Sequence, residues 1–352
     1  ILTRSMIIYG QGAIRCHPYV QDEMRAIEKW DPVLFDRSFF KHVGFVFANA
    51  TRALILGLTG GWPAGAGSGM VRGHLARLPH MSAAFSLVSA TAMATLGGML
   101  KRREPLSKHT SWRVGGPADR FYEPADAEDL AAFIKALPDR EPLYWIGLGS
   151  NLLVRDAGVR GTVIMLSGKL NGLERIDDNT VRAEVGVASA KLARFSVQQG
   201  LRGAEFLAGV PGTVGGALAM NAGAFGGETW SIVTAVETMD HAGRIRTRPP
   251  AEFQIGYRSV QGPAGEWFIA GHFGLTPGNE AEGQALIKSL LAKRGATQPT
   301  QWPNAGSVFR NPPGDYSARL IESTGLKGFC IGGACVSELH ANFIINTGGA
   351  PA

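Results

Sequence analysis

Two glycine-rich turns offer the first chemistry in this sequence of 352 residues. One spans residues 147–151 (Gly-Leu-Gly-Ser-Asn), directly after an apolar stretch, and the other spans residues 211–216 (Pro-Gly-Thr-Val-Gly-Gly). Because glycine has no Cβ, its backbone amides can surround a pyrophosphate. No Gly-Lys-Ser/Thr follows, which excludes a P-loop, and Leu152 occupies the third-glycine position of a Rossmann fingerprint. Each turn alone is typical of an ordinary tight turn, but together they predict two walls of one cofactor cleft.

The positive charge of the chain lies almost entirely in its first part. The net charge is +6, yet residues 1–103 carry 12 Lys and Arg against 5 Asp and Glu, which leaves 23 against 24 in residues 104–352. The cluster Lys101-Arg102-Arg103 has no interleaved aromatic residues of the kind that bind nucleic acid. We therefore expect no nucleic-acid partner.

The elements that must position the turns change in character near residue 104. Residues 31–60 and 70–100 have the pattern of helices, and Lys101–Arg103 is expected to end the second one, where positive charge is favourable. Further along, Asp126 is expected to cap a helix and Ser189 another. Strands are predicted at 143–146, 181–187, 232–240, 244–248, 267–275 and 343–346, and further helices at 280–294 and 315–324. The pattern indicates an α+β chain preceded by an all-α segment.

Membrane and metal-binding classes are not supported. No apolar run approaches the roughly 18 to 20 residues of a membrane span, and the first residues lack a signal-peptide pattern, so the sequence predicts a soluble, cytoplasmic protein. Cys16, Cys330 and Cys335 cannot all pair within one chain and lack metal-ligand spacing. A disulfide framework and a metal site are not expected.

Five ordered motifs then make the sequence recognisable. They lie at 109–118 (His-Thr-Ser-Trp-Arg-Val-Gly-Gly-Pro-Ala), 149–156, 209–223, 256–259 (Gly-Tyr-Arg-Ser) and 303–312 (Pro-Asn-Ala-Gly-Ser-Val-Phe-Arg-Asn-Pro). Over about residues 105–347 the chain resembles the UDP-N-acetylenolpyruvylglucosamine reductase family, also called UDP-N-acetylmuramate dehydrogenases. The resemblance implies a vanillyl-alcohol-oxidase-like (PCMH-type) FAD-binding fold with an α/β substrate domain. It suggests FAD-binding subdomains 104–167 and 168–276 and a substrate domain 277–352, which follow the helical segment 1–103.

The family's reaction assigns roles to individual residues. NADPH reduces FAD, and reduced FAD then reduces the enolpyruvyl ether of a UDP-sugar to UDP-N-acetylmuramate for peptidoglycan. By resemblance, Arg258 stabilises the enolate that hydride transfer leaves, and Ser307 protonates it. Without the motifs, Arg258 would be interpreted as a surface charge and Ser307 as a turn residue.

The remaining site residues also follow from the resemblance. The predicted cofactor-binding residues are Gly147, Gly149, Ser150, Asn151, Pro211, Gly212, Thr213, Gly215, Gly216, Asn221 and Gly223. The predicted substrate-binding residues are Tyr257, Lys293, Arg294, Asn311 and His340. A packing role for Tyr257 and a structural role for His340 remain open alternatives.

The sequence departs from the family at both ends. The family's C-terminal glutamate, in a Leu-Glu-Pro-Glu stretch, has no counterpart before Ala352, so we expect impaired reductase activity. Residues 1–103 resemble part of the C-terminal helical region of bacterial long-chain acyl-CoA dehydrogenases, which suggests a chimeric or fragmentary product. Cys16 and His17 are expected to pack a helix start. An acyl-CoA dehydrogenase fragment and a non-catalytic binder of flavin or nucleotide sugar therefore remain alternatives.

Overall fold

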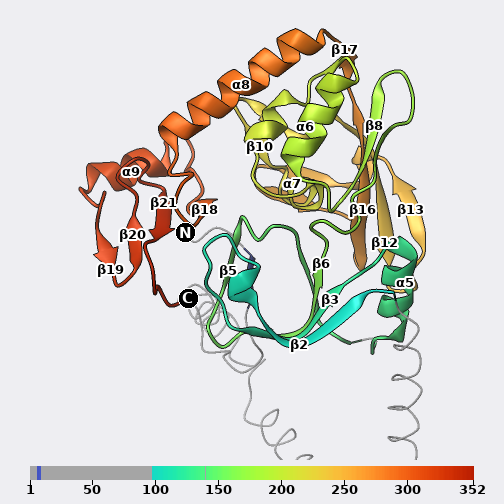
Figure 1. Ribbon diagram of the computed structural model, residues 1–352, viewed down its shortest axis with the longest axis horizontal. Helices are drawn as coiled ribbons and strands as arrows, with labels where there is room; N and C mark the ends of the chain where they lie inside the picture. Colours follow the sequence, from blue (N-terminus) through green and yellow to red (C-terminus); the bar gives the residue numbers. More distant parts are fainter. Residues whose placement is uncertain (1–5, 9–96, 139) are drawn as a thin grey trace, which may run out of the picture. The chain divides into compact units, whose positions relative to one another are not determined.

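The structure is a computed structural model that describes residues 6–8, 97–138 and 140–352 (Figure 1). The chain divides into two compact units, one made of residues 1–11 and 92–352 and the other of residues 12–91. The helices predicted before residue 97, together with Cys16 and His17, lie outside the described residues. No helix within the described part of the chain is long and apolar enough to cross a membrane.

A four-stranded mixed sheet carries the first glycine turn. Its order is β2 (Met99–Pro105), β3 (Pro117–Glu123), β6 (Val159–Met165) and β4 (Leu143–Ile146). Strands β3 and β4 run parallel to β6, while β2 is antiparallel to β3. The predicted helix is confirmed as α5 (Ala127–Ala136), whose cap Asp126 accepts a hydrogen bond from the Asp129 amide.

The prediction that the helix over 70–100 continues to Lys101–Arg103 is wrong, because Met99–Pro105 form strand β2. The strand pairs with β3 in a register that sets Lys101 opposite Phe121. The Lys101 ammonium forms an ion pair with Glu123 at 2.6 Å and lies 5.6 Å from the centre of the Phe121 ring. Pairing with a distant strand therefore decides the structure here, and the predicted boundary at 103/104 falls inside β2.

A five-stranded antiparallel sheet supports the second glycine turn. Its order is β13 (Ile245–Arg248), β12 (Val233–Asp240), β16 (Glu266–Gly274), β8 (Thr180–Glu184) and β7 (Leu173–Arg175), which confirms the strands predicted there. Helices α6 (Ser189–Gln198) and α7 (Val214–Met220) lie on one side of it (Figure 1). Leu192, Val197 and Leu218 join the strands in the largest hydrophobic core.

Ser189 does not cap helix α6 as predicted. The N-cap is Ala188, and the buried Ser189 hydroxyl has no hydrogen-bond partner in the described part of the chain. The Ser189 amide donates instead to the carbonyl of Gly212 at 3.1 Å, and Ala188 forms a bridge with Thr213. The start of α6 is thus set by the second glycine turn, which no local pattern could indicate.

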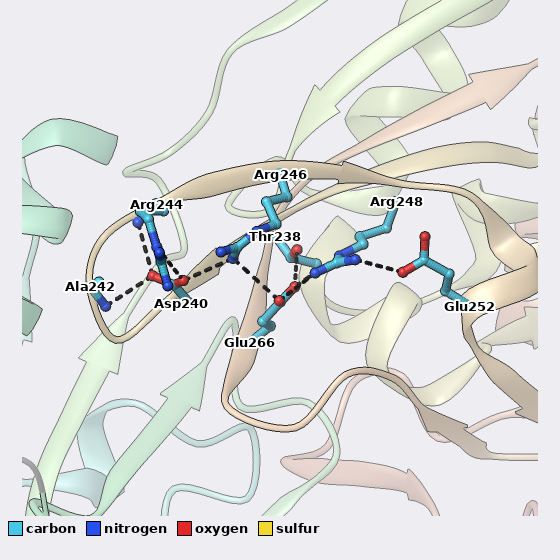
Figure 2. Close-up of polar contacts among 8 residues, drawn as sticks. All are labelled: Thr238, Asp240, Ala242, Arg244, Arg246, Arg248, Glu252 and Glu266. Carbon is cyan, nitrogen blue, oxygen red and sulfur yellow. Dashed lines mark hydrogen bonds and ion pairs between the residues drawn. The ribbon is translucent and has the colours of Figure 1, made fainter.

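A network of charged and polar side chains joins strands β12, β13 and β16 (Figure 2). Asp240 accepts hydrogen bonds from Arg244 at 2.9 Å and Arg246 at 2.8 Å. Glu266 accepts from Arg248 and from the Thr238 hydroxyl, both at 2.6 Å. The arginines of β13 are therefore matched by carboxylates of the same sheet.

The C-terminal part begins with the long helix α8 (Glu280–Thr297). An antiparallel sheet follows, in the order β18 (Asn304–Ser307), β21 (Phe343–Asn346), β20 (Ala334–Val336) and β19 (Cys330–Ile331), with helix α9 (Ser317–Ser323) between β18 and β19 in the chain. Cys330 lies opposite Cys335 in this sheet and the two form a disulfide. The expectation against disulfides is therefore wrong for this pair, because the pairing of β19 with β20 brings the two thiols together. The other short strands are β1 (Met6–Ile8), β5 (Leu152–Val154), β9 (Leu201–Arg202), β10 (Gly223–Ala224), β11 (Gly227–Glu228), β14 (Gln254–Gly256), β15 (Ser259–Gln261) and β17 (Thr276–Pro277).

Candidate active site

The two glycine turns lie in direct contact. The Ser150 hydroxyl donates to the carbonyl of Pro211 at 3.0 Å. A Cβ on Gly147 would lie 2.4 Å from Thr213 Oγ1, and one on Gly212 would lie 2.9 Å from Ser150 Oγ. The absence of these side-chain carbons thus allows the turns to meet.

Each turn has a conformation that its residues explain. Gly149 has φ +63°, and a Cβ there would lie 2.1 Å from the carbonyl oxygen of His109. Gly212 has φ +120°, and the next residue, Thr213, caps α7 with its hydroxyl accepting from the Gly216 amide. The second turn therefore leads directly into the first turn of a helix.

Several groups in these turns are available for an anionic ligand. Among the described residues, the amides of Gly149 and Ser150 donate to no acceptor. Gly216 is exposed, and a Cβ there would meet no atom within 4 Å. Free amides in one turn and an open glycine position in the other fit a phosphate or pyrophosphate.

Three predicted cofactor residues have structural tasks. Asn221 ends α7 with φ +43°, donates to Glu228 and accepts from the Trp230 amide, both at 3.0 Å. Gly223 pairs with Glu228 between β10 and β11. Gly215 donates to the carbonyl of Val185 at 2.9 Å. Their roles toward a cofactor stay predictions.

Arg258 joins the first glycine turn to the C-terminal sheet. It lies in the turn between β14 and β15, and its guanidinium donates to Asn151 Oδ1 and to the carbonyl of Ser307, both at 3.0 Å. Burial lowers the pKa of Arg258, Tyr257 opposes that shift, and the positive charge of Arg310 lowers the pKa further. The predicted catalytic pair, Arg258 and Ser307, is thus brought together by the fold.

Ser307 contacts this guanidinium through its backbone carbonyl. It is the last residue of β18, half-buried, and its carbonyl is occupied by Arg258. Its hydroxyl makes no hydrogen bond to any other described residue. A hydroxyl without an internal partner is able to donate a proton to a bound anion.

Arg310 lies against Arg258 and was not among the predicted site residues. Its Nη2 donates to the carbonyl of Arg258 at 2.7 Å, and its Nε is buried with no partner in the described structure. Neither Arg258 nor Arg310 forms an ion pair with a carboxylate of the described residues. Arg310 lies three residues after Ser307 in the 303–312 motif, and this proximity was the one signal that could have identified it.

The predicted substrate residues are spread more widely. Asn311 accepts from the Ser317 amide at 3.1 Å, and Tyr257 is 53% exposed beside Arg258 in the chain. The His340 Nδ1 accepts from the Asn342 amide at 3.2 Å, and burial lowers the pKa of its imidazole.

Two further predicted substrate residues lie in α8. Lys293 is exposed, while the half-buried Arg294 donates to Gln298 at 3.1 Å. Within the described residues, no hydrogen bond or ion pair joins Lys293, Arg294 or His340 to the Arg258–Ser307 pair. Their contact with a substrate stays a prediction.

Trp112 gives the 109–118 motif a structural role. Its indole donates to the carbonyl of Ile344 at 2.6 Å, and its carbonyl accepts from Asn346 at 2.8 Å. The neighbouring Ser111 amide donates to the carbonyl of Gly149 at 3.1 Å. This segment therefore ties strand β21 to the first glycine turn.

Comparison with known proteins gives consistent matches. The FAD binding domain model matches residues 118–248, and the model of the UDP-N-acetylenolpyruvoylglucosamine reductase C-terminal domain matches residues 298–352. The model of the acyl-CoA dehydrogenase C-terminal region of bacterial type matches residues 14–111, in agreement with the predicted resemblance of the first segment.

Individual relatives agree with these family models. The UDP-N-acetylenolpyruvoylglucosamine reductase of Alkalilimnicola ehrlichii is 60% identical over 253 residues, which are 72% of this chain and 85% of the relative. The reductase of Methylococcus capsulatus is 57% identical over 264 residues, 75% of this chain and 87% of the relative. The crystal structure of the Thermus caldophilus reductase has 33% identity and a TM-score of 0.62, and the match covers 72% of this chain and 90% of that one.

Proposed function

This chain belongs to the UDP-N-acetylenolpyruvoylglucosamine reductase family, and from that membership we propose how its own residues carry out the reaction. It is a flavin-dependent oxidoreductase of peptidoglycan precursor synthesis, a UDP-N-acetylmuramate dehydrogenase. NADPH is the proposed electron donor, the UDP-sugar enolpyruvate is the proposed small-molecule partner, and the reaction is proposed to take place in the cytoplasm.

The two glycine turns are the proposed holding site for FAD. The free amides of Gly149 and Ser150 and the open space at Gly216 fit its pyrophosphate. The family-model match over residues 118–248 spans both turns and supports this assignment. FAD, once reduced, supplies the hydride that the enolpyruvyl double bond accepts.

The observation that carries the proposal is the position of Arg258. Its guanidinium lies between Asn151 and Ser307, and neither it nor the adjacent Arg310 pairs with a carboxylate in the described structure. A half-buried cation without an internal counter-ion is suited to an anionic substrate group. Arg258 would bind the substrate carboxylate and stabilise the negative charge that develops there.

Ser307 is the proposed proton donor. Its hydroxyl is uncommitted, and the adjacent Arg258 favours negative charge nearby. Tyr257 and Asn311, close to the pair in the chain, are proposed to line the sugar site together with His340. Lys293 and Arg294 are proposed to face the UDP phosphates.

Absorption spectroscopy of the purified protein tests this function. We expect a bound yellow flavin that NADPH bleaches and UDP-N-acetylglucosamine enolpyruvate reoxidises. Bleaching by an acyl-CoA but not by NADPH would favour the acyl-CoA dehydrogenase fragment instead. A flavin that NADPH and the UDP-sugar leave unchanged would favour a non-catalytic binder.

A further inference from the structure

The turn that carries Arg258 has a backbone conformation that does not suit arginine. Gly256 and Ser259 are paired across the β14–β15 hairpin, so Tyr257 and Arg258 form its two-residue turn. Arg258 has φ +52°, in the left-handed region where the Cβ of an L-residue approaches a carbonyl oxygen. Glycine or asparagine is the usual choice at such a position. Some other contact must hold the arginine in place.

Arg310 provides that contact. Its Nη2 donates to the carbonyl oxygen of Arg258 at 2.7 Å, so a cation binds the backbone of the strained residue itself. Arg258 in turn donates to Asn151 Oδ1 and to the carbonyl of Ser307. Arg310 therefore binds the backbone of Arg258, while Asn151 and Ser307 bind its side chain.

The backbone of Arg310 is anchored by its neighbours. The Ser317 hydroxyl donates to the carbonyl of Arg310 at the start of α9. On the other side, the Asn342 side chain bonds both the amide of Phe309, at 2.8 Å, and its carbonyl, at 2.9 Å. These bonds leave the segment little freedom to follow a moving Arg258.

The burial of the Arg310 Nε is otherwise unexplained. Its Nε has no acceptor and its guanidinium pairs with no carboxylate among the described residues, so its interactions within the fold offset little of the desolvation cost. Arg310 also places a second positive charge beside Arg258, and the two charges repel each other. This repulsion argues against a purely stabilising role for Arg310. The hydrogen bond to Arg258 is the contact that distinguishes it.

We propose that Arg310 is a positioning residue for the reductase reaction. By binding the carbonyl of Arg258 it holds that residue in its left-handed turn and keeps the guanidinium between Asn151 and Ser307. The inference rests on the proposed role of Arg258. In it, Arg310 acts through Arg258 and does not touch the reacting atoms.

Kinetics of three variants test the proposal. Arg310→Met removes the donor, Arg310→Gln keeps a neutral one, and Arg310→Lys keeps a charged one. At saturating substrate, we expect flavin reoxidation by the enolpyruvyl substrate to fall about ten- to a hundredfold in Arg310→Met, as for a lost charged hydrogen bond, and to recover substantially in Arg310→Lys. Flavin content, melting temperature and flavin reduction by NADPH should stay near those of the wild type.

Arg319→Met is the matched control. It removes an arginine from α9 in the same part of the chain, where Arg319 pairs with Asp315 on the surface. We expect wild-type kinetics from it. Wild-type reoxidation in Arg310→Met, or an equal loss in Arg319→Met, would overturn the proposal. The proposal would also be overturned if reoxidation, flavin content, melting temperature and flavin reduction all fell equally in the three Arg310 variants. That result would assign Arg310 a merely structural role.

Crystal structures of the wild type and Arg310→Met test the same idea without turnover, with Arg310→Gln replacing any variant that fails to fold. We expect Arg258 to leave its positive φ and to lose its contact with Asn151 or Ser307. An unchanged Arg258 would contradict the inference. Failure of wild-type flavin to be reoxidised by the substrate would instead contradict the proposed function, and the crystallographic comparison would still decide the role of Arg310.

Discussion

Arg258 donates a hydrogen bond to Asn151 Oδ1 at 3.0 Å across 107 positions of the sequence. The contact connects the turn between β14 and β15 to the glycine turn that follows β4. Because the same guanidinium also holds the carbonyl of Ser307, one side chain connects the proposed flavin-binding turn to the proposed proton donor. The residues proposed for cofactor and substrate chemistry are thereby held close together.

Removing the Arg258 charge should impair substrate reduction selectively. In Arg258→Met we expect flavin reoxidation by the enolpyruvyl substrate to slow by roughly a hundredfold or more, because the developing charge loses its guanidinium. Stopped-flow measurement of the two half-reactions checks this. Asn151→Ala, which removes one of the two acceptors, should show a smaller loss, and a larger loss in Asn151→Ala would contradict the assigned roles.

Ser307→Ala should separate the two half-reactions in the same way. The variant lacks the hydroxyl that protonates the product anion, so reoxidation should slow by about a hundredfold, while flavin reduction by NADPH stays near normal. Equal loss in both half-reactions would count against Ser307 as the proton donor. Ser323→Ala, a surface serine of α9 that bonds the carbonyl of Leu320, serves as a control.

Gly147→Ala should disrupt the contact between the two glycine turns. Its Cβ would lie 2.4 Å from Thr213 Oγ1, so the turns must separate, and overpacking of this kind costs about 1–3 kcal/mol. We expect reduced flavin content, measured by absorbance, and a lower melting temperature. Gly295→Ala in helix α8, where a Cβ would meet nothing within 4 Å, should retain flavin and gain slightly in stability.

The Glu266 network should make stability depend on acid pH. The hydrogen bond from Arg248 holds the pKa of Glu266 below its ordinary value of 4.5 in the folded protein. The native state therefore binds fewer protons, so this stabilisation is complete above pH 4.5 and is lost as pH falls through the lowered pKa.

Urea unfolding at a series of pH values measures this effect. Glu266→Gln should flatten the decline in unfolding free energy below pH 4.5. Glu252→Gln changes another carboxylate partner of Arg248, but its side chain is 39% exposed against 10% for Glu266, so its effect should be smaller. If the unfolding free energy declined with falling pH equally in the wild type and in Glu266→Gln, the prediction would be refuted.

Local patterns predicted those parts of the fold that depend on local interactions. The cap at Asp126 and the β12–β13 hairpin were predicted because their signals lie within a few residues. The predictions failed at Lys101–Arg103 and at Ser189, where a partner distant in sequence decides the structure. Pairing with β3 and contact with Gly212 override the charge pattern and the capping preference.

The sequence by itself determined the family, the two glycine turns, and Arg258 and Ser307 as the proposed catalytic residues, because these are carried by residue types in ordered motifs. Only the tertiary structure decided that Ser150 meets Pro211 and that Asn151, Ser307 and Arg310 surround Arg258. Arg310 has the residue type of any surface arginine, and its hydrogen bond to the Arg258 backbone exists only because folding brings two segments 52 positions apart into contact.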